Sequence, residues 1–236
     1  MSENSVRTII DCGNQYRKEY LDPLKGDTLL TDWWKALDFL WGHSFYQGRS
    51  DEVSWRVRQA AESVLEQNRL QIEQSYIDGD WGPVKAALSG KIGRGMVGKG
   101  RDIQMVLSVF AFLQGIENRN ILAHSVRMIN EQRIFAHFNE LQTIVQVGPK
   151  IASFYLRDVV SLFRLDSLVP EDYQILLQPV DSWVRKIAAA IGISGVDDAD
   201  QVICKSIVGF AKPRSISPIL FNQGLWYAGK NGIRLG

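Results

Sequence analysis

Two residues, a lysine and an aspartate, each stand at the start of a predicted helix, where their side chains could support chemistry. Lys150 follows Gly148 and Pro149. Glycine permits a sharp turn, and proline suits the first position of the helix that follows it. The free N–H groups of such a helix start suit a phosphate oxygen, and Lys150 would lie beside that oxygen. An uncharged lysine amine is also a nucleophile, and burial or a nearby positive charge favours the uncharged form. Lys150 therefore has two candidate roles, phosphate contact and nucleophilic attack.

The aspartate is the last residue of the motif Pro179-Val180-Asp181. Aspartate is a favoured N-cap, because its carboxylate accepts N–H bonds from the first turn of the helix. The bonds that make such a cap also stabilise an ionised carboxylate. At a cleft, that charge can stabilise the positive charge that develops on a sugar ring during bond cleavage. The structural role and the catalytic role of Asp181 are compatible.

The spacing of apolar residues predicts that helices position both groups. Alternating runs of β-branched residues, which are typical of strands, hardly occur. We expect Thr31 to cap a helix that runs to about Tyr46, and Ser50 or Asp51 to cap the next one. A further helix should open at Pro149 after a hairpin. The remaining predicted helices span 6–20, 53–68, 82–88, 102–114, 120–136, 181–191, 200–210 and 218–229. The predicted fold class is all-α.

The composition sets limits on the kind of protein. The hydrophobic share of 45% supports a substantial core, and the net charge of +1 does not by itself indicate a nucleic-acid binder. A local basic strip would be sufficient for DNA binding. Cys12 and Cys204 cannot form a disulfide framework or supply the four thiolates of an iron–sulfur cluster. Signal-peptide features are lacking, and the longest apolar run, around Met105 to Leu113, is too short to span a bilayer.

The segment Leu141 to Ala152 reads Leu-Gln-Thr-Ile-Val-Gln-Val-Gly-Pro-Lys-Ile-Ala. Together with the Pro-Val-Asp motif at 179–181, it resembles the helix-hairpin-helix DNA glycosylase superfamily. That superfamily's signature is Leu-x-x-Ile-x-Gly-Val-Gly-x-Lys-x-Ala followed by Pro-Val-Asp. The resemblance implies one domain over 1–236, with two helical lobes, a cleft between them and a hairpin motif at 139–163. By this resemblance, Lys150 matches the Schiff-base lysine and Asp181 the catalytic aspartate.

The long connection between these two residues is similar to that of the archaeal-type 8-oxoguanine DNA glycosylase. Two other segments resemble the same family, namely Phe45-Tyr46-Gln47 with Trp55, and the stretch from Pro218 to Trp226. In a base pocket, Phe154 and Trp226 would supply the stacking faces, and Gln47 would hydrogen-bond the base. Each of these three could equally be an ordinary core or turn residue. The resemblance also places Asn222 in the base pocket. It stands where the family has an aspartate, which leaves the accepted base open.

The hairpin also departs from the family. Gln146 replaces its first glycine, whereas Val147 and Gly148 agree with it. The resemblance implies that these three residues contact DNA phosphate. Another stretch, residues 90–101, is rich in glycine and contains Lys91, Arg94, Lys99 and Arg101. Its sequence almost matches a nucleotide-binding P-loop. It lacks the serine or threonine that would hold magnesium, so a basic loop on phosphate or a solvated loop fits better.

The histidines His43, His124 and His137 have no metal-ligand spacing, and we expect ordinary surface or core roles for them. The resemblance implies no metal and no organic cofactor. It implies a base-excision-repair DNA glycosylase with AP-lyase activity, which removes an oxidised purine, 8-oxoguanine first of all. The partner would be double-stranded DNA with a damaged base or an abasic site. The protein would be an intracellular monomer, cytoplasmic or nucleoid-associated, without membrane contact.

Two alternatives remain open from the sequence. A helix-hairpin-helix protein without catalytic activity would use Lys150 for phosphate contact and would need Asp181 only as a cap. It would bind duplex DNA with a steep dependence on salt and would cut no strand. A glycosylase for another damaged base, such as an alkylated one, would keep the chemistry and change the pocket.

Overall fold

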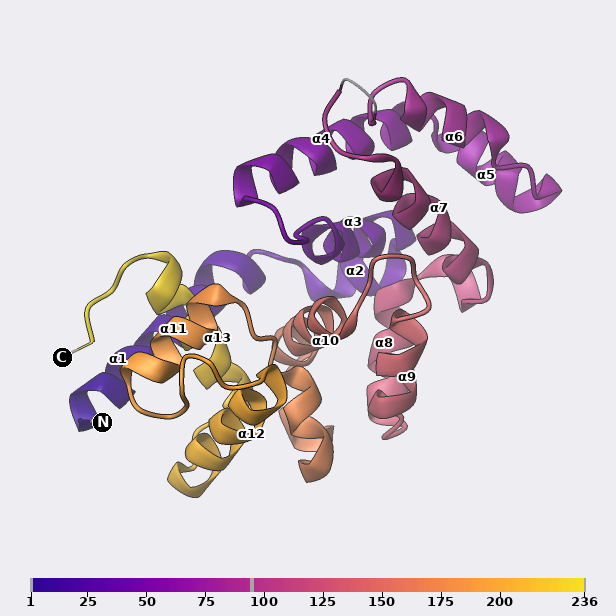
Figure 1. Ribbon diagram of the computed structural model, residues 1–236. Helices are drawn as coiled ribbons and strands as arrows, with labels where there is room; N and C mark the ends of the chain where they lie inside the picture. The colour runs from indigo at the N-terminus through magenta and orange to yellow at the C-terminus, as the bar shows by residue number, and fades with distance from the viewer. Residues whose placement is uncertain (1, 94–95, 236) are drawn as a thin grey trace.

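The chain folds into a set of packed α-helices, shown in Figure 1. The computed structural model describes residues 2–93 and 96–235. Within these residues there is no β-strand, and Ile92 and Val97 form one isolated bridge. This confirms the predicted all-α class. None of the described helices is both long enough and apolar enough to cross a membrane.

In the first half of the chain, the described residues form seven α-helices and one π-helical turn, η1, which directly continues the first helix. Their bounds are α1 Glu3–Tyr16, η1 Arg17–Leu21, α2 Gly26–Thr31, α3 Trp33–Ser44, α4 Asp51–Gln67, α5 Arg69–Asp78, α6 Gly82–Ser89 and α7 Gly100–Gln114.

Up to residue 235, the second half forms six α-helices, with short 3₁₀ turns beside them. The helices are α8 Ile121–Asn130, α9 Ile134–Leu141, α10 Pro149–Phe163, α11 Ser182–Ala190, α12 Asp200–Ala211 and α13 Pro218–Lys230. The 3₁₀ turns are Glu117–Arg119, Asp166–Leu168, Glu171–Leu177 and Lys212–Arg214.

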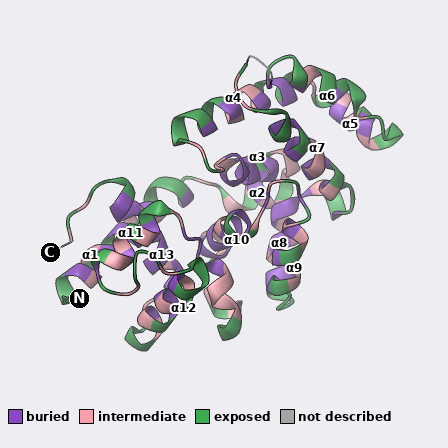
Figure 2. Ribbon diagram, in the orientation of Figure 1, coloured by how far each residue is buried: buried purple, intermediate pink, exposed green. Residues whose placement is uncertain are grey.

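Two hydrophobic clusters hold these helices together, and Figure 2 shows the buried faces. The larger cluster includes residues of α1 to α10 and of α13, among them Leu40, Phe110 and Leu156. The smaller one joins α11, α12 and α13 and includes Ile207 and Phe221. In Figure 1, α10 runs through the middle, with α4 to α7 on one side and α1 and α11 to α13 on the other. Helix α10 is therefore placed to connect the two groups.

Local capping explains several helix starts. The Ser50 hydroxyl accepts the N–H of Val53, so α4 begins where the sequence predicted. The next prediction was wrong by one residue, because Asp32 rather than Thr31 caps α3 and accepts from Trp34 and Lys35. An aspartate can accept both N–H groups at once, whereas the Thr31 hydroxyl donates back to the carbonyl groups of its own helix.

Two further predictions need correction. The region 120–136 is not one helix but two, α8 and α9, because Gln132 adopts a left-handed conformation with φ of 58° between them. A helix interior cannot include that conformation. Helix α5 was not predicted, because its sequence has little helical periodicity and leaves Leu70 and Ile77 exposed.

The helix that was predicted to open at Pro149 is present as α10. Helix α9 ends at Leu141, residues 142–148 make a tight connection, and α10 begins at Pro149. Gln146 lies in the left-handed region, with φ of 67°, which normally favours glycine. The turn is therefore made at the position where the resembling family has glycine, but here with a side chain present.

Candidate functional site

A cavity of about 1170 Å³ lies where the ends of several helices meet. Residues from α1, α3, α10 and α13 line it, together with the segments before α2, before α4 and before α11. Cavities of roughly 300–1,000 Å³ hold most small-molecule ligands, so this one can admit a group as large as a nucleoside. The cavity is therefore the candidate site for the chemistry predicted for Lys150 and Asp181.

Lys150 and Asp181 both line this cavity, although 31 residues separate them. Lys150 lies in the first turn of α10, is exposed, and has no ion pair among the described residues. The Asp181 oxygen Oδ1 accepts the N–H groups of Trp183 and Val184, each at 2.9 Å, and so caps α11. None of the described donors bonds to the other oxygen, Oδ2. The amine and one carboxylate oxygen are therefore free to meet a ligand.

Aromatic side chains form much of the wall. Phe154 lies one turn after Lys150 and packs edge-on against His43, with ring centroids 4.5 Å apart. Trp226 of α13 packs edge-on against Tyr16 at 5.5 Å. Both predicted stacking residues thus line the cavity. Because each ring is only partly buried, a face or edge remains available to a ligand.

Beneath this wall lies a buried charged network that the sequence did not reveal. Asp158 of α10 is 2% exposed and lies within hydrogen-bond distance of four side chains. Its Oδ2 accepts from Tyr16 Oη at 2.6 Å and lies 3.0 Å from His43 Nε2. Its Oδ1 accepts from Arg157 Nε at 2.9 Å and from Gln223 Nε2 at 3.0 Å. The network therefore joins α1, α3, α10 and α13 at one carboxylate.

Arg157 extends this network to the loop that carries Asp181. Its Nη2 donates to Tyr16 Oη at 2.8 Å, and its Nη1 donates to Asn222 Oδ1 at 2.9 Å. Asn222 in turn donates to the carbonyl oxygen of Pro179 at 3.2 Å. The chain of bonds thus ends two residues before Asp181. Arg157 and Asn222 fix the position of that aspartate without contacting it through a hydrogen bond.

The electrostatics follow from burial and pairing. Burial alone would raise the pKa of Asp158, but Arg157 and then His43 outweigh it and hold the pKa well below its ordinary value. Burial lowers the pKa of the Arg157 guanidinium, and Asp158 more than offsets this and raises it. Burial raises the pKa of Tyr16 well above its ordinary value. The network is therefore an ionised pair with a neutral tyrosine.

The cavity is more positive than the chain as a whole. Seven lysine and arginine residues line it against four aspartates, while the complete chain has a net charge of only +1. The basic residues are Lys25, Lys35, Arg49, Arg58, Lys150, Arg157 and Lys230. Such a concentration attracts an anionic ligand. A balanced overall composition is compatible with such a local basic surface, which is sufficient for DNA binding.

Two predicted base-binding residues do not line the cavity. Gln47 directs its amide nitrogen to the carbonyl oxygen of Ser44 and, at 3.2 Å, to the sulfur of Met105. Gln47 therefore acts as an ordinary turn residue, which was the alternative to base binding. Asn222 is completely buried, with its amide bonded to Arg157 and Pro179. Asn222 supports the cavity from below, and neither residue is placed to touch a base directly.

The three hairpin residues differ in what they offer to a phosphate. The N–H of Val147 already donates to the carbonyl oxygen of Ile144 at 2.9 Å, and its side chain is buried. Val147 thus lacks a free donor. None of the described hydrogen bonds uses the backbone N–H of Gln146 or of Gly148. The Gln146 amide nitrogen is also buried without a partner. The two backbone N–H groups are therefore the donors that remain for an anion, whereas the buried side-chain amide of Gln146 is not accessible to one.

The glycine-rich stretch 90–101 leads directly into α7. Lys99 is the N-cap of that helix, and its N–H donates to Asp102 Oδ2 at 2.7 Å. Asp102 also pairs with Arg49, so this part of the stretch is held from both sides. No strand precedes it in the described chain, which excludes the strand–loop–helix context of a P-loop. Arg94, one of its predicted basic residues, lies outside the described residues.

The histidines divide between two places. His43 belongs to the network under the cavity, where Nδ1 also lies 2.8 Å from the carbonyl oxygen of Phe39. His124 and His137 lie together on α8 and α9, beside Glu140. Sequence spacing gave no indication of that grouping.

The buried pair, by contrast, left a signal in the sequence. Arg157 and Asp158 are adjacent charged residues within an apolar helical run, where charges must find partners. This signal could have identified them as buried, but not their partners Tyr16 and His43, which lie more than a hundred residues earlier.

In comparisons with known proteins, no protein-family model, curated protein or solved structure matches the chain.

Proposed function

We propose that the protein is a DNA glycosylase with AP-lyase activity, which acts on an oxidised purine. One observation supports this most directly, namely that Lys150 and Asp181 line the same cavity, which is large enough for an extruded nucleoside. The hairpin 142–148, the two groups of helices on either side of α10 and the cavity together agree with the helix-hairpin-helix resemblance. The positive lining supports a polyanionic partner such as DNA.

In the proposed reaction, the Lys150 amine attacks C1′ of the extruded nucleotide. The new N–C1′ bond forms as the bond from C1′ to the base breaks, and the leaving base takes up a proton. The amine loses a proton and the sugar ring opens, which gives a Schiff base. Loss of a C2′ proton then expels the 3′ phosphate and breaks the strand. The free oxygen of Asp181 would stabilise the positive charge on the sugar before the Schiff base forms.

The cavity wall offers stacking faces for a flat base but does not distinguish one damaged purine from another. Phe154 and Trp226 would stack on the flat base. The amide of Gln47 is used inside the protein, and so is that of Asn222. Recognition of the base edge would therefore fall to other groups of the cavity. We name 8-oxoguanine as the first substrate to test, with an alkylated purine as the substrate of the alternative glycosylase.

Borohydride trapping tests the proposal. Duplex DNA with 8-oxoguanine, or with an abasic site, is incubated with the protein and borohydride, which reduces a Schiff base to a stable adduct. We expect an adduct with the wild-type protein and none with Lys150→Gln. Lys205→Gln, on α12, removes another exposed lysine that does not line the cavity, and it should leave the adduct intact. An undiminished adduct with Lys150→Gln would remove this lysine from the mechanism.

The exposure of Lys150 supports a second candidate, a DNA-binding protein without catalytic activity. An exposed lysine beside free N–H groups is also suited to simple phosphate contact. In that case duplex DNA would bind in a salt-dependent way, no adduct would form on any lesion, and Lys150→Gln would weaken binding alone. The trapping experiment therefore separates the two candidates.

A further inference from the structure

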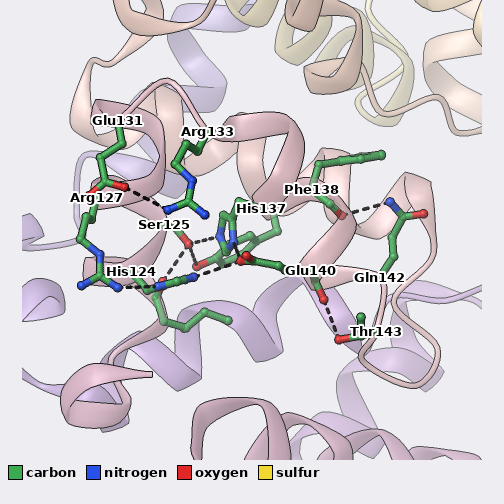
Figure 3. Close-up of polar contacts among 12 residues, drawn as sticks. His124, Ser125, Arg127, Glu131, Arg133, His137, Phe138, Glu140, Gln142 and Thr143 are labelled. Atoms are coloured by element: carbon green, nitrogen blue, oxygen red, sulfur yellow. Dashed lines mark hydrogen bonds and ion pairs between the residues drawn. The ribbon is translucent and has the colours of Figure 1, made fainter. Parts of the chain in front are cut away.

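Three side chains that the proposed reaction does not use converge on one point between α8 and α9 (Figure 3). They are His124, His137 and Glu140. His124 Nε2 and His137 Nδ1 each lie 3.2 Å from Oε2 of Glu140, and the potential ligand atoms all lie within 4.8 Å of one another. None of the three lines the large cavity.

These separations match the geometry of a small metal ion. Zinc binds imidazole nitrogen and carboxylate oxygen at about 2.0–2.1 Å, so neighbouring ligands of a tetrahedral site lie about 3.3 Å apart. The two distances to Glu140 already have this value. The distance between the two imidazoles needs only a small rotation of the more accessible ring, that of His124. Two imidazoles and a carboxylate are also a ligand set that suits zinc.

The hydrogen bonds around His137 also support a metal site. Ser125 Oγ lies 2.8 Å from His137 Nε2, 2.7 Å from the carbonyl oxygen of Ile121 and 2.9 Å from Tyr155 Oη. Tyr155 can donate to the serine, but Ser125 itself has only one proton to donate. If His137 carries its proton on Nδ1, toward Glu140, Ser125 must donate in both directions. If the proton is on Nε2, the Nδ1 lone pair faces the Glu140 carboxylate. Either arrangement of an uncharged ring leaves one contact without a hydrogen. A ring protonated on both nitrogens completes these contacts, and so does an uncharged ring with a metal ion on Nδ1.

We propose that His124, His137 and Glu140 form a binding site for one divalent transition-metal ion, zinc in first place. The ion takes the lone pair of His137 Nδ1 and one oxygen of Glu140. His137 Nε2–H then donates to Ser125, and the serine donates to Ile121, so every contact has its hydrogen. Because the Glu140 side chain is 39% exposed, water can reach the ion and complete the coordination. This site does not depend on the proposed function.

One contact must change when the ion binds. Arg127 Nη2 lies 3.0 Å from His124 Nδ1, and a guanidinium can only donate, so His124 carries its proton on Nε2 in the structure. Metal binding at Nε2 moves that proton to Nδ1 and displaces Arg127. The displacement is easy, because the Arg127 side chain is 47% exposed and its other partner is the exposed Glu117. Arg127 thus competes with the metal.

The position of the site indicates its effect. Helices α8 and α9 are joined by the short turn that contains Gln132, and Glu140 lies two residues before the connection 142–148. The ion would clip the two helices together next to that connection. Bound metal stabilises the folded state through its binding free energy, so zinc should raise the unfolding temperature.

Calorimetric titration of the metal-free protein with zinc chloride tests the site. We expect one ion per chain, and an affinity at least tenfold lower in His124→Gln and in Glu140→Gln. Arg127→Ala should bind zinc more tightly than the wild type. Glu131→Gln, an exposed charge change at the end of α8, is the matched control and should bind as the wild type does. Cobalt(II) in place of zinc should give a spectrum without thiolate bands, which excludes Cys12 and Cys204.

Thermal unfolding with and without zinc gives the second measurement. Zinc should raise the unfolding temperature of the wild type and of Glu131→Gln, but not that of Glu140→Gln. Glu140 and His124 are chosen because they are not fully buried, so their variants should fold without metal. Absence of saturable binding would overturn the proposal, and so would equal binding by Glu140→Gln and Glu131→Gln.

Discussion

Two layers of the same cavity are built in opposite ways. At the bottom, Asp158 and Arg157 are almost fully buried, and each makes several hydrogen bonds to protein groups. At the mouth, Lys150 is exposed without an ion pair, and Asp181 uses one oxygen as a helix cap and leaves the other free. The difference suggests that the buried residues position the helices and that the exposed residues take part in the reaction. Groups whose bonds are all satisfied can hold helices in place, whereas groups with free atoms can meet a substrate.

The largest expected effect is on the buried layer. Asp158→Asn leaves the Arg157 guanidinium buried without a counter-charge, so it should lower the free energy of unfolding by about 3–5 kcal/mol. Urea unfolding followed by circular dichroism measures the change. Lys150→Gln, at the mouth, is the comparison and should change stability by less than about 0.5 kcal/mol. Equal losses in the two variants would remove the distinction between the layers.

At the mouth, the expected effect is on activity rather than on stability. Asparagine caps a helix about as well as aspartate does, so Asp181→Asn should keep α11 intact while it removes the charge. We expect base excision to slow about a hundredfold, which corresponds to about 2.7 kcal/mol of lost transition-state stabilisation. Single-turnover kinetics on an 8-oxoguanine duplex measures this. An unchanged rate would mean that Asp181 is only a cap.

The buried layer should also make the protein sensitive to acid. Because the pKa of Asp158 is lowered in the folded state, its contribution to stability is complete above the unfolded value, about 3.9, and is lost as the pH falls below it. The unfolding free energy of the wild type should therefore fall faster than that of Asp158→Asn, by up to about 1.4 kcal/mol per pH unit. Urea titrations between pH 5 and pH 2.5 compare the slopes. Parallel slopes would contradict the lowered pKa.

The smallest expected effect is at the hairpin. Gln146 adopts a left-handed conformation that costs a residue with a side chain about 1–2 kcal/mol, which glycine avoids at some cost in the unfolded state. Gln146→Gly should therefore raise stability by up to about 1 kcal/mol, with chemical unfolding as the measurement. Gly148→Ala is the control, because Gly148 has an ordinary negative φ. A loss of stability in Gln146→Gly would show that the side chain supports the turn.

The sequence predicted much of the fold, and for local reasons. The Ser50 cap, the proline that begins α10 and the Asp181 cap all depend on bonds within a few residues. The predicted helix boundaries were wrong where two neighbouring residues could cap a helix or where one residue left the helical conformation. Asp32 displaced Thr31 as a cap, and a left-handed Gln132 divided one predicted helix into α8 and α9.

The candidate site was predicted only in part. Lys150, Asp181, Phe154 and Trp226 line the cavity, whereas Gln47 and Asn222 do not. The amide of Gln47 can bond in many directions, and the position of Met105 decides which one it takes. Nothing in the local sequence specifies that neighbour.

By itself, the sequence determined where helices begin and which residues present a free amine or a capped carboxylate, because those properties follow from the backbone of a single turn. The tertiary structure alone decided which of these groups share a space. Tyr16 and Asp158 are 142 residues apart and meet at 2.6 Å, and His124 reaches Glu140 across a helix break. Such contacts depend on how whole helices pack, since packing is set by the summed burial of many apolar side chains rather than by any short motif.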